Sequence, residues 1–149
     1  MYSSLYIANE FISIAKAKNQ YLTPIQLIKL VYIAHGWNLG LNNRQLVAED
    51  VMAWKYGPVI PELYREIKSY KANKINNNIP VSSNLDLQDC DKALVQEVYE
   101  KYGKFTGIQL SVITHQKGSP WSKTWEVNPW GAIPDFEIDN YYKELLASV

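Results

Sequence analysis

Cysteine and long apolar runs are nearly absent from the sequence, and both absences restrict where the chain can work. Cys90 is the single cysteine among 149 residues, so no intrachain disulfide can form and a reducing compartment is expected. No run approaches the roughly 20 apolar residues of a transmembrane helix. The first ten residues lack the basic start and apolar stretch of a secretory leader. We therefore expect a cytoplasmic protein that does not enter a membrane.

Groups that carry catalysis are equally scarce. The two histidines and the cysteine do not occur at the spacings of zinc or metalloprotease motifs. Cys90 stands between Asp89 and Asp91, whose negative charges oppose formation of a thiolate. Ser119 lacks the second glycine of a nucleophile elbow, and no glycine-rich phosphate loop is present. The sequence therefore predicts no enzyme, no metal site and no cofactor.

Formal net charge is zero, but the charge is unevenly spread. Residues 1–75 carry nine Lys/Arg against five Asp/Glu, and residues 76–149 carry six against ten. The two halves either attract each other within one fold or steer a charged partner. A basic stripe also recurs every three residues, at Arg65, Lys68, Lys71 and Lys74. Without a recognition-helix motif it indicates a solvated helix face, and we do not expect nucleic acid as a partner.

What the sequence does contain is the composition of a folded helical domain, with 47% apolar residues and 13% aromatic ones. Apolar residues recur at three- and four-residue steps behind capping residues, and prolines stand at two expected helix starts. These patterns predict five or six helices, over residues 3–18, 24–41, 61–72, 89–103, 106–115 and from Asp135 or Asp139 onward. We expect one mainly α-helical domain over residues 1–149.

The remaining segments predict other structure. β-forming residues near 46–54 indicate a short strand or hairpin, followed by a turn at residues 56–61. Residues 73–88 are rich in Asn and Ser without periodicity, which is typical of a mobile surface loop. Residues 118–131 hold three tryptophans among glycines and prolines, and we expect an irregular segment pinned by its indole rings.

Three of these segments together resemble a known family. They are residues 22–37 (LTPIQLIKLVYIAHGW), residues 53–64 (AWKYGPVIPELY), and Leu110 with the segment 114–121 (THQKGSPW). In this order they resemble the Panacea domain, also called the SocA-like antitoxin domain. The block from Trp54 to Tyr64 is the most specific part of the match. Ile28 departs from the pattern, since a polar residue, often glutamine, is expected there.

The resemblance implies a bacterial or phage protein, in some cases encoded in a prophage, that neutralises a toxin by binding it directly. Some members of the family instead act as adaptors that deliver a toxin to a AAA+ protease. We therefore expect a cognate toxin as the partner and occlusion of that toxin as the mechanism. Delivery to a protease is the alternative, and a nucleic-acid-binding regulator is a more distant one.

A rigid surface of prolines and aromatic rings offers contact area at a small entropic cost, and such residues make good interface anchors. The candidate partner-binding residues are the proline–aromatic turn, the basic residues that follow it and the polar end of the helix near residue 115: Tyr56, Pro58, Val59, Pro61, Tyr64, Arg65, Lys68, His115, Gln116 and Trp121. The aromatic members fit equally well as core residues beneath the turn, because buried Tyr and Trp have the same sequence pattern. His115 fits either a contact role or a helix C-terminal cap.

Overall fold

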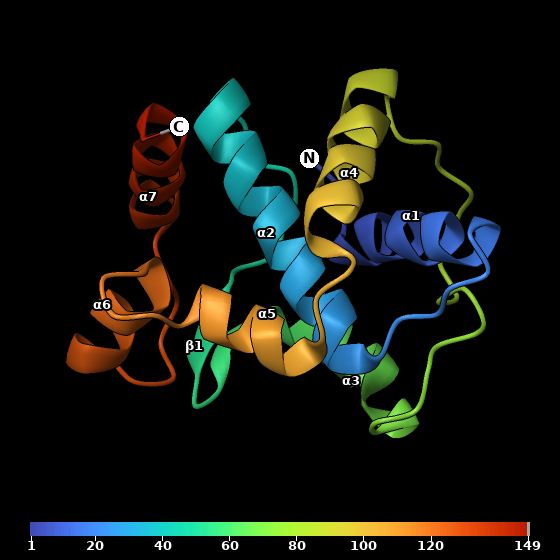
Figure 1. Cartoon of the computed structure of the whole chain (residues 1–149), viewed down its shortest axis with the longest axis horizontal. Helices are drawn as coiled ribbons and strands as arrows, with labels where there is room; N and C mark the ends of the chain where they lie inside the picture. The colour runs from blue at the N-terminus through green and yellow to red at the C-terminus, as the bar shows by residue number, and fades with distance from the viewer. Residues whose placement is uncertain (149) are drawn as a thin grey trace.

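Helix α2 (Pro24–Asn42) runs through the centre of the computed structural model, which describes residues 1–148. Figure 1 shows α7 on one side of it and α1 and α4 on the other. Only one of its residues, Lys29, is Lys, Arg, Asp or Glu, and the helix is buried on nearly all sides, as expected for a central helix. Thr23 and Gln26 form a reciprocal capping box at its start, and Pro24 occupies the first turn, as the sequence predicts.

The other elements pack around this helix. They are α1 (Ser4–Ala17), β1 (Met52–Trp54), β2 (Gly57–Val59), α3 (Pro61–Ile67), the short 3-10 helix η1 (Lys68–Tyr70), α4 (Asp89–Tyr102), α5 (Gly107–Thr114), α6 (Pro120–Val127) and α7 (Asp135–Ala147). They share one apolar core whose largest fully buried side chains include Phe11, Tyr32 and Leu63. The expectation of a mainly helical chain with a short hairpin is confirmed.

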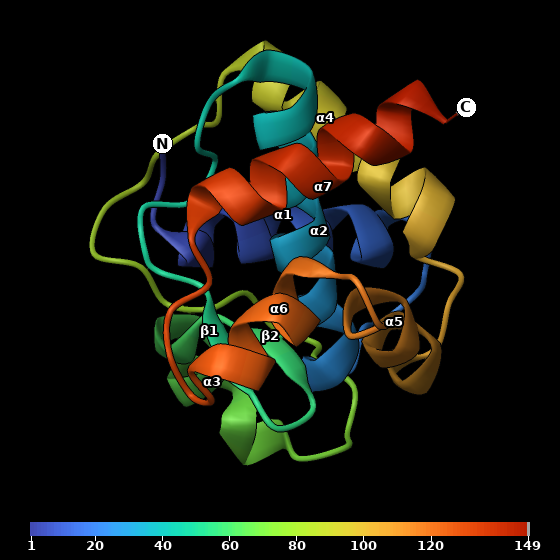
Figure 2. The same cartoon turned by 90° about the vertical axis from the view of Figure 1, so that its left-hand side faces the viewer.

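β1 lies within the region near 46–54 where we expected a short strand or hairpin, and β2 follows it directly. β1 and β2 pair antiparallel, with Met52 opposite Val59 and Trp54 opposite Gly57. The segment that precedes α7 runs along the outer edge of β1, where Ala53 N donates to Gly131 O at 2.8 Å and Ile133 N donates to Val51 O at 2.7 Å. Figure 2 shows α6 in front of the hairpin and α3 close to it. The hairpin is therefore flanked by α3, which follows it in the chain, and by α6 and the segment before α7 from the C-terminal part of the chain.

Two expectations about local structure need correction. Within residues 1–148 there are seven α-helices rather than five or six, because the segment expected to be irregular contains α6. Ser119 accepts a hydrogen bond from Ser122 N and Pro120 fills the first turn, so a complete helix start was present in the sequence. The helix expected over 61–72 ends earlier, with α3 passing into η1 and Lys71 adopting a positive φ of 56°.

Residues 71–88 contain no helix or strand, in agreement with the expected loop, but three apolar side chains anchor this segment. Ile75, Ile79 and Leu87 are buried in the core. The side chain of Asn9 on α1 also exchanges two hydrogen bonds with the backbone of Ile79, at 2.7 and 2.9 Å. Mobility of the segment stays a prediction. Because these residues are anchored, we expect motion only in the stretches between them.

Candidate functional site

The hairpin presents a corner whose shape depends on Gly57. This residue has a φ of 122°, which only glycine adopts without strain, and it precedes Pro58. A buried lysine of α2, Lys29, donates from Nζ to the carbonyl oxygen of Pro58 at 3.0 Å. From the other side, the indole nitrogen of Trp121 on α6 donates to Trp54 O at 2.6 Å. The corner is therefore fixed by hydrogen bonds from two helices.

Beside this corner is an apolar cavity of about 320 Å³, which we call the corner pocket. Its lining comes from α2, the hairpin, α3, α5 and the segment before α7: Ile25, Ile28, Lys29, Trp54, Lys55, Tyr56, Val59, Tyr64, Ser111 and Trp130. Ile28, Lys29 and Val59 are buried and form its floor. The volume is at the small end of the range for ligand pockets, about 300–1,000 Å³, and suits one large side chain.

The rim of the corner pocket gathers large apolar side chains that are exposed to solvent. Tyr56 is 72% exposed, Trp130 56% and Ile25 49%. Ile108 and Val112 continue this apolar surface along α5, on either side of the pocket residue Ser111. Exposed apolar side chains that are scattered need no explanation, whereas a contiguous group around a cavity is typical of an interaction site.

Lys29 is the unusual member of the lining. Its side chain is only 4% exposed, and no carboxylate forms a salt bridge with it within residues 1–148. Burial lowers the pKa of Lys29 to about 8, because the apolar surroundings penalise the charged form. No Asp or Glu lines the pocket. The floor therefore holds a cation whose charge has no counterion in the described part of the chain.

Five of the residues predicted to bind a partner are in the hairpin and the start of α3. Tyr56, Val59 and Tyr64 line the corner pocket together, and the ring of Tyr64 packs edge-on against Trp54 with centroids 5.2 Å apart. Pro58 is buried, and its carbonyl accepts the hydrogen bond from Lys29. Pro61 begins α3 and is partly buried, outside the pocket lining.

Arg65 and Lys68 extend from this corner along α3 and η1. Both are exposed, and Arg65 lies 3.8 Å from Glu62, one turn earlier on the same helix. This surface pair contributes little to stability, because its charges remain solvated. The two residues are available to an acidic partner but do not line the corner pocket.

The three predicted residues near the end of α5 do not line the pocket. Gln116 is exposed, while Trp121 is only 9% exposed and stacks on Trp125 with centroids 5.4 Å apart. His115 packs edge-on against Trp121, and its Nδ1 contacts the carbonyl of Ser111 in the last turn of α5. This contact supports the capping interpretation of His115. Of the ten predicted residues, Tyr56, Val59 and Tyr64 therefore line the corner pocket, and the other seven lie outside its lining.

Seven of the ten lining residues were not predicted from the sequence: Ile25, Ile28, Lys29, Trp54, Lys55, Ser111 and Trp130. For Lys29 a signal was available, since it is the single Lys, Arg, Asp or Glu in an otherwise uncharged helix of 19 residues. For Trp130 none was available, because its position depends on the segment that pairs with β1 far away in the sequence.

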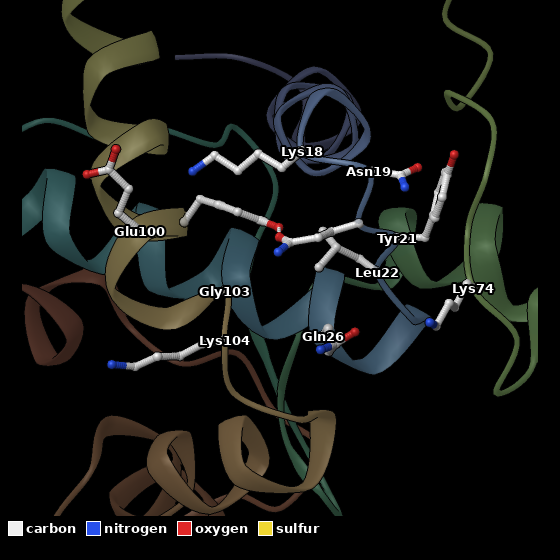
Figure 3. Close-up of a pocket in the computed structure, with 11 residues that line it drawn as sticks. Lys18, Asn19, Tyr21, Leu22, Gln26, Lys74, Glu100, Gly103 and Lys104 are labelled. Carbon is white, nitrogen blue, oxygen red and sulfur yellow. Dashed lines mark hydrogen bonds between the residues drawn. The ribbon is translucent and has the colours of Figure 1, made fainter.

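A second hollow, of about 530 Å³, is polar (Figure 3). It lies between the ends of α1 and α4 and the start of α2, and Lys18, Lys74 and Lys104 are among its lining residues. Figure 3 shows the amino groups of these three lysines well apart from one another, so that they do not converge on one point. They are exposed to solvent, and Glu100 adds an opposite charge. None of the large exposed apolar side chains of residues 1–148 lines this hollow, so it is the weaker candidate for a protein interface.

The histidines and the cysteine each contact different neighbours and do not come together in one site. Nδ1 of buried His35 accepts hydrogen bonds from Leu46 N and Val47 N, both at 3.3 Å, so Nε2 carries the proton that is shared with Asp135 at 3.1 Å. This bond from His35 lowers the pKa of Asp135. Cys90 lies beside Arg44 and Asp91. Among the described residues, no group of three His, Cys, Asp or Glu is placed to hold a metal ion. That the chain is not an enzyme stays a prediction.

The hairpin and eight of the ten lining residues of the corner pocket, all except Ile25 and Trp130, lie within the region that matches a known family. Residues 27–122 match the family described as antitoxin SocA-like, Panacea domain. The chain belongs to this family. It is also similar to a protein named antitoxin SocA from Caulobacter vibrioides (strain NA1000 / CB15N), with 32% identity over 126 residues. That alignment covers 77% of this chain and 66% of the relative's length. No solved structure matches the chain.

Within residues 1–148, no helix is both long enough and apolar enough to cross a membrane. Membership of an antitoxin family implies a toxin as partner in general terms, without naming it.

Proposed function

We propose that this Panacea-domain protein neutralises a cognate toxin by binding it directly and covering its active surface. The observation that carries the proposal is the corner pocket, an apolar cavity with exposed Tyr56, Trp130 and Ile25 around it. Large aromatic side chains around a cavity are typical of interface anchors. Hydrogen bonds from Lys29 and Trp121 hold the corner in place, so little conformational entropy is lost on binding.

Neutralisation is tested by expressing the neighbouring gene's product, as the candidate toxin, with and without this chain. Occlusion requires that growth is rescued in cells that lack the AAA+ proteases, and that the two purified proteins form a stable complex. Rescue that is lost without a protease would replace occlusion with the adaptor mechanism. Absence of both rescue and a complex for this pair would contradict the proposal.

The contact surface is tested with Tyr56→Ala. Because Tyr56 is 72% exposed, its removal should leave the melting temperature nearly unchanged. If the ring is an anchor, binding of the toxin should weaken by about 2 kcal/mol, or roughly thirtyfold, in calorimetry.

Phe136→Ala is the matched control, since this aromatic residue of α7 is 62% exposed but does not line the pocket. It should leave both stability and affinity unchanged. Equal effects of the two variants on affinity would move the contact surface away from the corner pocket.

A further inference from the structure

Lys29 gives the corner pocket a chemical preference that its apolar lining alone would not have. Its ammonium group has three N–H donors, and one of them bonds the carbonyl oxygen of Pro58. A buried charge is costly unless it is paired, and an apolar side chain of the same length would avoid that cost. Lys29 is one of the buried residues that line a cavity whose rim is apolar and exposed.

We propose that the corner pocket receives an acidic segment of the partner protein, in which an apolar side chain fills the cavity and an adjacent carboxylate accepts hydrogen bonds from Lys29. The inference rests on the proposed function and specifies the partner's chemistry at this site. Charge complementarity favours an acidic occupant, because Lys29 and Lys55 both line the pocket and no carboxylate does.

The other titratable groups at the pocket do not supply the missing charge. Lys55 lies over the ring of Tyr56, with its Nζ 5.5 Å from the ring centroid. Tyr56 and Tyr64 are the other ionisable groups of the lining. On the neighbouring elements, Glu62, Arg65 and Glu66 of α3 and His115 after α5 lie outside the lining. The lining therefore offers a net positive charge to an incoming group.

Binding of a carboxylate should consequently depend on pH. Burial lowers the pKa of Lys29 to about 8 in the free protein, and a bound carboxylate would raise that pKa. Above about pH 8 the free protein must take up a proton to form the pair, so affinity should fall by up to about tenfold for each pH unit. Below pH 8 the affinity should be nearly constant.

The first test uses a small probe and does not need the toxin. Indole-3-propionate carries an apolar ring beside a carboxylate, indole-3-propionamide is its neutral counterpart and tryptamine is its cationic one. Titrations followed by the indole N–H signals of Trp54 and Trp130 should give the order carboxylate, amide, amine, with about tenfold between the first two. Lys29→Met, which keeps the apolar stem without the charge, should abolish the preference for the carboxylate and its pH dependence.

The result that would overturn the inference is an amide that binds as well as the carboxylate, or a preference that survives in Lys29→Met. In the first case the site takes an apolar segment without a carboxylate. In the second, Lys29 serves only to hold the Pro58 carbonyl. Self-association of the free protein that shifts the Trp130 signal would instead place a second copy in the pocket, and would also overturn the inference.

The second test uses the purified toxin. Lys29→Met should weaken its binding by about thirtyfold or more, as expected when one partner of a buried charge pair is removed. Lys55→Met removes the same charge from the rim and should cause a smaller loss that vanishes at high salt. A toxin bound equally well by wild type and Lys29→Met would overturn this inference and leave the proposed function intact. A toxin that wild type does not bind would contradict the proposed function, while the probe titration would still decide the preference of the pocket.

Discussion

At the scale of single residues, the buried charge of Lys29 is expected to lower the stability of the free protein. Burial lowers its pKa from 10.5 to about 8, so below pH 8 the folded protein holds a charge that is more stable in the unfolded chain. This difference corresponds to about 3 kcal/mol of destabilisation at neutral pH. A residue that lowers stability at a candidate binding site is consistent with a role in function rather than in folding.

The stability of the free protein should therefore rise with pH in a defined window. Between about pH 8 and 10.5 the unfolded chain still holds the proton that folded Lys29 has released, so the free energy of unfolding increases with pH. Relative to Lys29→Met, wild type should gain about 2 kcal/mol between pH 7 and pH 9.5 in urea unfolding. Both proteins contain the same tyrosines, so the difference between their stability curves reports the contribution of Lys29 alone. Parallel stability curves would show that Lys29 is better solvated than its burial indicates.

At the scale of elements, the corner depends on the backbone of Gly57. A Cβ at this position would lie 2.9 Å from Lys29 Nζ, and the φ of 122° is strained for any other residue. Gly57→Ala should therefore lower the free energy of unfolding by about 1–3 kcal/mol and also disturb the position of Lys29. Urea unfolding and the carboxylate probe measure the two effects separately.

Gly118→Ala is the matched control for that variant. Gly118 also has a positive φ, 87°, but a Cβ there meets no atom within 4 Å. Gly118→Ala should lower the free energy of unfolding through backbone strain alone and leave binding of the carboxylate probe unchanged. If both variants weakened the probe equally, the effect at Gly57 would not come from contact with Lys29.

The elements also show how much of the fold and site the sequence could predict. Helices with local signals were predictable: the Thr23 cap with Pro24 gave the start of α2, and the capping box of Thr106 gave the start of α5. The helix α6 was missed because its tryptophans were interpreted as pins for an irregular segment, although Ser119 and Pro120 form an ordinary helix start. The strand or hairpin was predicted near residues 46–54, where β1 lies, but the pairing of its outer edge with residues 130–133 is a contact that local periodicity does not encode.

The same limit applies to the candidate site. Tyr56, Val59 and Tyr64 could be predicted because they share one short block that carries the family resemblance. Trp130 could not, because its approach to the hairpin is a long-range contact. The ring of Trp130 packs against the ring of Trp125, with centroids 5.4 Å apart. Whether an aromatic residue of this chain fills the core or the rim was decided by tertiary packing, as Trp121 and Tyr56 illustrate with 9% and 72% exposure.

At the scale of the whole molecule, the charge asymmetry between the two halves of the sequence is partly used inside the fold. Arg44 lies 3.3 Å from Asp91, and His35 shares a proton with Asp135, so both pairs join the basic half to the acidic one. The basic stripe of Arg65, Lys68, Lys71 and Lys74 remains exposed. It begins on α3, which also contributes Tyr64 to the corner pocket, and continues through the residues that follow, where its exposed charges can act on an approaching partner.

This stripe should influence how fast an acidic partner arrives rather than how tightly it is held. Replacing Lys68 and Lys71 by Glu should slow association with the toxin about tenfold at low salt and weaken the salt dependence of the rate, because rim charges act mainly on encounter. Stopped-flow or surface-based kinetics measure both the association rate and its salt dependence, while the melting temperature should be unchanged since both side chains are exposed.

The control is Lys16→Glu with Lys101→Glu, which makes the same change in net charge on α1 and α4, away from the corner, and should slow association much less. Equal slowing by the two double variants would assign the effect to net charge alone. A steeply salt-dependent affinity of wild type for duplex DNA, lost on replacing Lys68 and Lys71, would show instead that the stripe binds nucleic acid.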